Sequence, residues 1–167
     1  MKWRTTSCWA ASAVALLAGC GGTARPVAHA QVAHLNWTEA GDPHNLLGGP
    51  IVFRVRTLRI GPKGWTVDGA VTNRTKQPLG IVYGHEAPGH NAFGIVLGRS
   101  GTGPVATATR FHPPVPILLR PGERWSGTFS GPDPIARGAL VHVQFGQFGT
   151  LHADRFSWVT DHAYRVR

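Results

Sequence analysis

Alternating apolar and polar residues, interrupted by turn signals about every 8 to 12 residues, restrict this chain to a strand-based fold more than any other feature of its sequence. In IVFRVRTLRI, the apolar Ile51, Phe53 and Val55 fall on one face of an extended segment and arginines fall on the other. The turn residues 61–64 follow, and WTVDGAVTN alternates again from Trp65. The two segments therefore predict neighbouring, half-buried strands.

About seven to nine short strands are expected over the whole chain, because no segment beyond the first 20 residues keeps a helical period for about 12 residues. The chain carries 22 Gly and 13 Pro, which disfavour helix interiors and supply turns between strands. The other strand candidates are 79–83, 92–98, 105–111, 117–119, 124–131, 139–146, 155–160 and 163–166. This pattern predicts a single all-β domain, an antiparallel sandwich or barrel.

Residues 1–19 have the composition of a bacterial export signal. Lys2 and Arg4 give a positive start, and an apolar run of about 11 residues follows, too short to span roughly 30 Å of hydrocarbon as a helix. The run ends in LAGC, residues 17–20, which resembles the lipobox of bacterial lipoproteins. The resemblance implies cleavage before Cys20, diacylglycerol on its sulfur and acylation of the new amino terminus. Lipid would then hold the protein on the extracytoplasmic face of the cell membrane.

Residues 20–50 are expected to form the lipidated cysteine, a flexible tether of about 20 residues and an irregular lead-in, because no helical or strand period is sustained there. The sandwich domain is then expected over residues 51–167. Ala28-His29-Ala30 offers an alternative cleavage site, which would release a soluble protein beginning at Gln31. The chain has two cysteines, one in the signal and one lipidated, so disulfides and thiolate metal sites are excluded from the mature domain.

A second resemblance comes from the order of two motifs. The segment WTVDGAVTNRT, residues 65–75, is followed much later by LRPGE, residues 119–123. This order resembles immunoglobulin-like domains of bacterial surface lipoproteins, in which a strand of the type W-x-V-x-G-x-V-x-N-x-T precedes a Pro-Gly-Glu turn into another strand. The resemblance covers residues 50–145 and implies an immunoglobulin-like sandwich that serves as a non-catalytic surface or binding module. It carries over no functional residues.

Histidine is unusually frequent, with nine residues in the chain, and one segment suggests metal binding. His85, Glu86 and His90 supply two imidazoles and a carboxylate within HEAPGH, and His112 or His152 would complete a zinc or copper site if the fold brought it close. The spacing is not that of a helical zinc-protease motif, because Pro-Gly interrupts it. The alternative is that these histidines are solvated or bonded to nearby backbone, and no cofactor besides the covalent lipid is expected.

Aromatic residues offer another kind of site. Most aromatic residues of a sandwich are expected in its core, and Trp65 in particular, because it alternates with Val67. The alternative for Trp125 and Trp158 is a role as exposed platforms that bind a sugar or a peptide. His142 lies between two valines of a strand and is expected on the opposite face from both. The sequence has no nucleophile elbow, no specially spaced carboxylate pair and no phosphate-binding glycine loop, so no catalysis is expected.

The net charge of +9 invites a nucleic-acid hypothesis, which the export signal argues against. Loss of Lys2 and Arg4 leaves +7 on a domain that meets anionic lipid headgroups and envelope polymers rather than DNA. Arg54 and Arg56 on one strand face are candidates for that contact, and ordinary solvated arginines are the alternative. The predicted function is a membrane-anchored binding or accessory module of the cell envelope, whose partner is an envelope protein or polymer. A histidine-based metal-binding or carrier module is the alternative.

Overall fold

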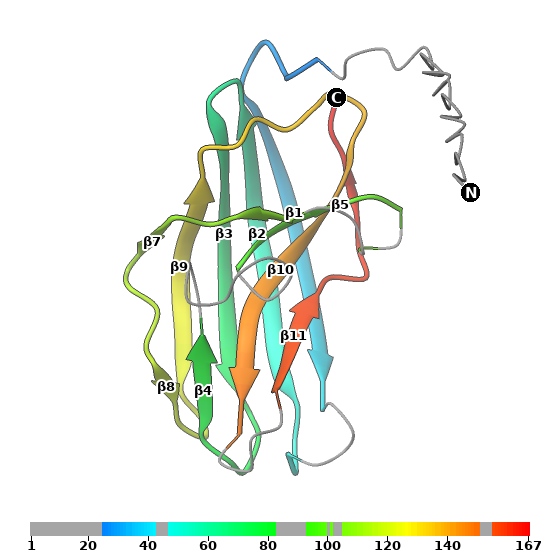
Figure 1. Ribbon diagram of the computed structural model, residues 1–167. Coiled ribbons are helices and arrows are strands. Elements are labelled where there is room, and N and C mark those ends of the chain that lie inside the picture. The colour runs from blue at the N-terminus through cyan, green and yellow to red at the C-terminus, as the bar shows by residue number, and fades with distance from the viewer. Residues whose placement is uncertain (1–24, 43–46, 83–92, 100, 102–104, 151–154) are drawn as a thin grey trace, which may run out of the picture.

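A computed structural model describes residues 25–42, 47–82, 93–99, 101, 105–150 and 155–167, and these residues form two antiparallel sheets packed face to face (Figure 1). The described residues contain strands and turns but no helix, so the predicted all-β sandwich is confirmed. The strands are β1 (Gln31–Gly41), β2 (Ile51–Gly61), β3 (Gly64–Asn73), β4 (Leu79–Val82), β5 (Gly94–Leu97), β6 (Val105–Thr107), β7 (Arg110–His112), β8 (Leu118–Leu119), β9 (Arg124–Gly131), β10 (Leu140–Gly149), β11 (Arg155–Val159) and β12 (Tyr164–Arg165). The described residues alone form twelve strands, where seven to nine were expected for the chain.

One sheet has the order β1–β2–β3–β9–β7. The predicted strands at 51–60 and 65–73 are confirmed as β2 and β3, which form a hairpin closed by the pair Gly61 and Gly64. Their alternation is explained by burial, because the inward residues contact the core, whereas the outward face carries exposed residues such as Arg54 and Arg59 beside covered ones such as Val52 and Ala70.

The second sheet is built around β10. β11 pairs with β10 from Gln144 to Gly149 and therefore occupies one edge of that strand. β5 pairs with Gln144 and β4 pairs with Gln147, so these two strands follow each other along the opposite edge. β6 and β8 extend the sheet from β5 and β4. Residues 83–92, which contain the predicted metal ligands, connect the end of β4 to the residues before β5 and lie outside the described residues.

The segment 105–111, expected as one strand, is two strands in different sheets. β6 pairs with β5, whereas β7 pairs with β9. The crossing occurs at two adjacent residues: the N–H of Ala108 donates to the carbonyl of Phe93 at 2.8 Å, and the N–H of Thr109 donates to the carbonyl of Ser130 at 2.8 Å. Period-2 alternation continues through such a crossing, which is why the sequence pattern does not show it.

The lead-in expected at residues 20–50 is corrected by the structure, because β1 pairs with β2 along almost its whole length. The fold begins still earlier. The carbonyl of Arg25 accepts a hydrogen bond of 3.0 Å from the N–H of Arg137, Pro26 bridges to Ala136, and Val27 is 3% exposed within the core. The tether expected to span about 20 residues therefore ends by Arg25. The sequence pattern does not predict β1, because β1 is an edge strand whose half-buried face includes the polar Gln31 and Glu39 among apolar residues.

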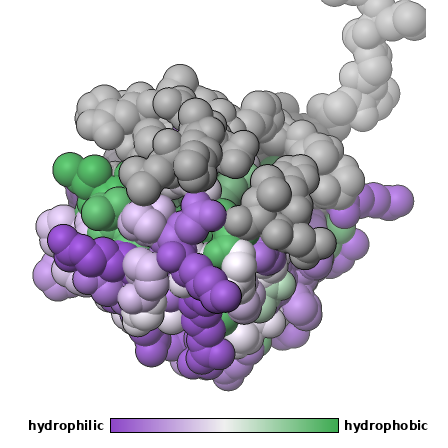
Figure 2. All heavy atoms as spheres, turned by 90° about the horizontal axis from the view of Figure 1, so that it is seen from below, coloured by the Kyte–Doolittle hydropathy of each residue, from purple (hydrophilic) through white to green (hydrophobic). Residues whose placement is uncertain are grey.

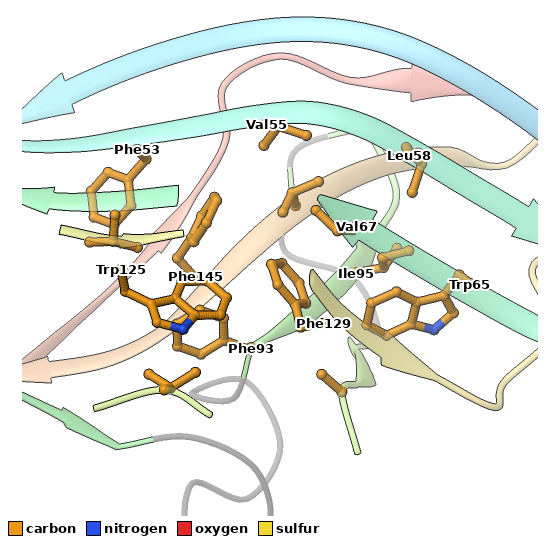
Figure 3. Close-up of a cluster of buried hydrophobic side chains, with 14 of the residues drawn as sticks. Phe53, Val55, Leu58, Trp65, Val67, Phe93, Ile95, Trp125, Phe129 and Phe145 are labelled. Atoms are coloured by element: carbon orange, nitrogen blue, oxygen red, sulfur yellow. The ribbon is translucent and has the colours of Figure 1, made fainter. Parts of the chain in front are cut away.

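Aromatic rings from both sheets fill the space between them (Figure 3). Phe93, just before β5, packs edge-on against Phe129 of β9 at 5.3 Å and against Trp125 at 6.0 Å between ring centroids. Phe145 of β10 packs on Phe129 at 5.7 Å and on Phe53 of β2 at 5.2 Å. Since aromatic pairs bury large apolar areas at these separations, this cluster is the main contact between the sheets.

Residues 1–19, where the sequence predicts an export signal, and Cys20 precede the described residues. Where the chain is described, no helix has the length and apolar character needed to cross a membrane.

Candidate anion-binding groove

The outer face of the five-stranded sheet carries a row of side chains that crosses all five strands near one end of the sandwich. Strand register places Val32 opposite Arg59, Arg59 opposite Thr66, Thr66 opposite Ser130, and Ser130 opposite Arg110. Residues at matched positions on neighbouring strands point to the same face. The row therefore brings two arginines and two hydroxyl groups together from segments far apart in the chain.

A β-bulge decides that Arg59 belongs to this outer face. Strict alternation from Ile51 and Phe53 would turn Arg59 inward. In β2, however, the partner of Val55 on β3 is Gly69 and the partner of Thr57 is Asp68, so Arg56 is an extra residue. One extra residue reverses the faces that follow, because the side-chain period of a strand is two.

A groove of about 550 Å³ lies beside this row, at the end of the sandwich where β2 turns into β3. Its lining comprises Ala30, Gln31, Val32, Arg59, Ile60, Gly61, Pro62, Lys63, Gly64, Trp65, Thr66, Thr109, Arg110, Ser130, Gly131 and Pro132. Gly64 has a φ of 135°, and a side chain there would clash with the carbonyl oxygen of Gly131. The hairpin can approach the end of β9 this closely only because residue 64 is glycine.

The groove is cationic. Arg59, Lys63 and Arg110 are exposed, and none has an ion-pair partner among the described residues. No Asp or Glu lines the groove as far as the chain is described. Unpaired arginine and lysine side chains beside hydroxyl groups are the donors that bind phosphate and carboxylate.

Asp68 is two residues from the groove residue Thr66, but its charge is already neutralised. Arg56 donates to both carboxylate oxygens of Asp68, at 3.0 Å from Nε and 2.6 Å from Nη2, and donates to Oγ of Ser126 at 2.9 Å. The hydrogen bond to Asp68 raises the pKa of Arg56. Of the two arginines expected to contact an anionic surface, Arg56 is thus tied to the sheet, while Arg54 is exposed.

Trp65 forms the inner wall of the groove and, as predicted, belongs to the core, with 3% of its surface exposed. It packs edge-on against Phe129 at 6.1 Å. Its Nε1–H has no acceptor among the described residues. A buried donor that lacks an acceptor costs about 1–3 kcal/mol.

A second hollow of about 420 Å³ adjoins the groove, and Gln31 lines both. Its lining includes Arg25, Arg137 and Arg167, again without an Asp or Glu among the described residues. In Figure 1 the described N-terminal segment and the β2–β3 turn both lie at the upper end of the sandwich. We call the residues Arg25, Arg59, Lys63, Arg110 and Arg137 the cationic end.

At the opposite end of the sandwich, Figure 2 shows that the described residues form a surface of mixed hydrophilic and hydrophobic areas. The exposed large apolar side chains of the described chain include Ile117 and Leu118, at β8. These are too few to form a substantial apolar patch.

The predicted metal site lies mostly outside the described residues. His85, Glu86, His90 and His152 are among those not described, and His112 is exposed on β7. The described residues contain no group of three His, Cys, Asp or Glu side chains that could hold an ion. Metal binding at His85, Glu86 and His90 stays a prediction.

His142 lies on the face of β10 away from the neighbouring valines, as alternation predicts, but it is buried there. Its Nδ1 donates to the carbonyl of Thr160 at 2.7 Å. Its Nε2 has no partner among the described residues. A side chain at Gly101 would contact the His142 ring, so the segment after β5 covers this face of the second sheet.

The alternative of exposed aromatic platforms at Trp125 and Trp158 does not fit the structure. Trp125 is 4% exposed and its Nε1 donates to the carbonyl of Pro113 at 3.2 Å, so Trp125 belongs to the core. Trp158 is half-buried, with its ring stacked on Phe53 at 4.8 Å. Both indoles serve the contact between sheets, because burying a large ring stabilises the core more than exposing it.

The described part of the chain is thus an antiparallel β-sandwich with a cationic groove at one end. Comparison of the chain with protein-family models, with curated protein sequences and with solved structures gave no match. The function must be argued from the sequence and from this geometry alone.

Proposed function

We propose that this protein is a bacterial lipoprotein, anchored through Cys20 to the extracytoplasmic face of the cell membrane, whose immunoglobulin-like sandwich is a non-catalytic binding module of the cell envelope. The lipobox LAGC at residues 17–20 is the basis of the anchor. The cationic groove is the candidate binding site of the module. Its ligand carries negative charge, because three unpaired cations and no acid line it where the chain is described.

The observation that carries this proposal is the short distance along the chain between the lipobox and the fold. Arg25, the fifth residue after Cys20, already has its carbonyl bonded within the sandwich. Cleavage at the alternative site, before Gln31, would remove Val27 from the core together with the bridge from Pro26 to Ala136. Losing a buried valine costs about 1.5–3 kcal/mol, so cleavage before Cys20 leaves a better fold.

The contact between the two motifs that resemble immunoglobulin-like domains supports the second part of the proposal. Asn73, at the end of β3, is fully buried and its Nδ2 donates to the carbonyl of Leu119 at 2.9 Å. Its backbone carbonyl accepts from the N–H of Gly122 at 2.7 Å, and its N–H donates to the carbonyl of Glu123 at 2.9 Å. The strand motif and the Pro-Gly-Glu turn therefore stabilise each other across the end of the sandwich.

Metabolic labelling with palmitate in a bacterial host tests the anchor. The wild-type chain and Cys8→Ser are expected to take up label and to float with membranes, because Cys8 lies in the cleaved signal. Cys20→Ser is expected to lose the label, and globomycin to block processing of the wild type. An unlabelled soluble product that begins at Gln31 would overturn the proposal.

A further inference from the structure

We propose that the cationic end docks on the anionic phospholipid headgroups of the membrane that holds the lipid anchor, so that the sandwich stands on the bilayer through its groove. The lipid phosphate is the group that the groove binds. This inference rests on the proposed function for the identity of the membrane, and its test below does not depend on acylation.

Chain length places the cationic end near the bilayer. Arg25 is the fifth residue after Cys20, and a fully extended chain covers at most about 3.6 Å per residue, or about 18 Å in all. The described N-terminal segment lies at the same end of the sandwich as the β2–β3 turn (Figure 1). The anchor therefore presents this end of the sandwich to the lipid surface and holds the opposite end farther away.

Charge complementarity points the same way. Arg25, Arg59, Lys63, Arg110 and Arg137 are exposed at the cationic end, and neither hollow is lined by an Asp or Glu among the described residues. A basic residue at an anionic bilayer surface contributes about 1 kcal/mol of attraction, which falls off over a Debye length of about 10 Å. Only cations that face the bilayer within about this distance therefore contribute to the attraction.

The groove adds a feature that a flat basic surface lacks. Arg59 and Arg110 reach it from separate strands, and the hydroxyl-bearing Thr66 and Ser130 lie between them in register. Guanidinium groups bind phosphate through paired N–H donors, and hydroxyl groups supply further donors. The groove thus fits a phosphate that projects from the bilayer.

Vesicle flotation of the unacylated mature chain tests the inference. The protein used is residues 20–167 with Cys20→Ser, which retains every described residue. It is mixed with phosphatidylcholine vesicles that contain either no phosphatidylglycerol or about one-third phosphatidylglycerol. We expect the protein to float with the anionic vesicles and to remain unbound with the neutral ones. Raising the salt from about 0.1 M to about 0.5 M is expected to release it.

Two triple variants of equal net charge separate the groove from charge in general. Arg59→Gln/Lys63→Gln/Arg110→Gln is expected to lower the partition coefficient on the order of 100-fold, because it removes three cations that face the lipid surface. The matched control, Arg54→Gln/Arg74→Gln/Arg124→Gln, removes three exposed arginines outside both hollows. Its partition coefficient is expected to stay within about threefold of the parent, since these residues lie beyond the range of the surface charge. Thermal unfolding of both variants establishes that they are folded.

Three results would overturn the inference. The first is that the parent protein does not float with anionic vesicles. The second is that the two triple variants lose vesicle binding equally. The third is that the protein binds an acidic polysaccharide through the groove but does not bind vesicles. The last result would assign the groove to an envelope polymer. Because acylation is absent from this assay, failure of docking is distinct from failure of palmitate labelling at Cys20.

Discussion

Nε1 of Trp158 on β11 donates a hydrogen bond of 3.0 Å to Oε2 of Glu39 on β1. The two strands belong to different sheets, so this bond closes one side of the sandwich. The same carboxylate accepts from the N–H of Asp161 at 3.2 Å and from Nδ1 of His162 at 2.8 Å. The His162 ring stacks on Trp37 of β1 at 5.5 Å. The Glu39 side chain, which is only 9% exposed, therefore links the C-terminal segment to β1 through these hydrogen bonds.

Replacing Glu39 by Gln is expected to destabilise the fold by about 1–3 kcal/mol at neutral pH, because the charged acceptor of several donors is lost. Chemical denaturation of the wild type and Glu39→Gln measures the difference. Thr38→Ala, on the exposed face of the same strand, is the control and is expected to change stability by less than about 0.5 kcal/mol. Equal effects of the two substitutions would contradict this role of Glu39.

The effect of Glu39 depends on pH. Burial raises the pKa of Glu39, but hydrogen bonds from His162 and Trp158 and from the backbone lower it, and the net pKa lies below its usual value of 4.5. A carboxyl whose pKa is lower in the folded state stabilises the fold above its unfolded pKa and loses that contribution as pH falls through the folded value. The wild type is therefore expected to lose more stability than Glu39→Gln between pH 5 and pH 3. Parallel pH dependence of both proteins would exclude this contribution.

Asn73 is expected to be among the most sensitive buried polar residues. Its Nδ2 donates to the carbonyls of Gln77 and Leu119, and its Oδ1 accepts from the N–H of Thr75 at 2.9 Å. Asn73→Ala removes these three hydrogen bonds from a buried site and is expected to cost at least about 2 kcal/mol. Thr72→Ala, which alters the outward neighbour, serves as the matched control. An unfolding midpoint for Asn73→Ala close to that of the control would refute the prediction.

Two glycines with positive φ should respond differently to alanine. Gly64 has a φ of 135° and its added side chain would meet the backbone of Gly131, whereas Gly122 has a φ of 82° with no atom within 4 Å. Gly122→Ala is expected to cost about 1–2 kcal/mol from backbone strain alone. Gly64→Ala is expected to cost more and to open the groove, because the hairpin must move away from β9. Thermal unfolding compares the two variants. A larger loss of stability in Gly122→Ala than in Gly64→Ala would show that the hairpin does not pack tightly against Gly131.

Zinc or copper titration addresses the histidine segment. If His85, Glu86 and His90 hold a divalent ion, His85→Ala/His90→Ala is expected to abolish saturable binding measured by calorimetry. His29→Ala/His34→Ala removes two histidines from the N-terminal part and is the matched control, expected to leave the affinity unchanged. Binding that persists in His85→Ala/His90→Ala would eliminate that site.

Much of the first sheet could be predicted from sequence. The alternation from Ile51 and from Trp65 predicts two strands, and the glycines between them predict the turn, because one buried face imposes a period of two. β1 could not be predicted in this way. Its half-buried face includes Gln31 and Glu39, whose partners are the C-terminal residues Arg167 and His162, far away in the chain.

The groove could not be predicted for a related reason. The bulge at Arg56 turns Arg59 outward, and its local mark in the sequence is the three-residue step from Val55 to Leu58, which breaks the period of two. Arg110 joins the groove because the chain crosses from one sheet to the other at Ala108 and Thr109. Alternation records which residues are apolar, but the partner strand and the register decide which residues become neighbours.

By itself the sequence determined the all-β class, the β2–β3 hairpin and the burial of Trp65, since these depend on local pattern and on the burial of apolar surface. It also supplied the basis for expecting an export signal and a lipid at Cys20. Only the tertiary structure brought Arg59, Lys63 and Arg110 to one groove and joined Glu39 to Trp158. The physical reason is that long-range pairing of strands sets these distances, and it minimises the free energy of the whole sandwich rather than that of any single segment.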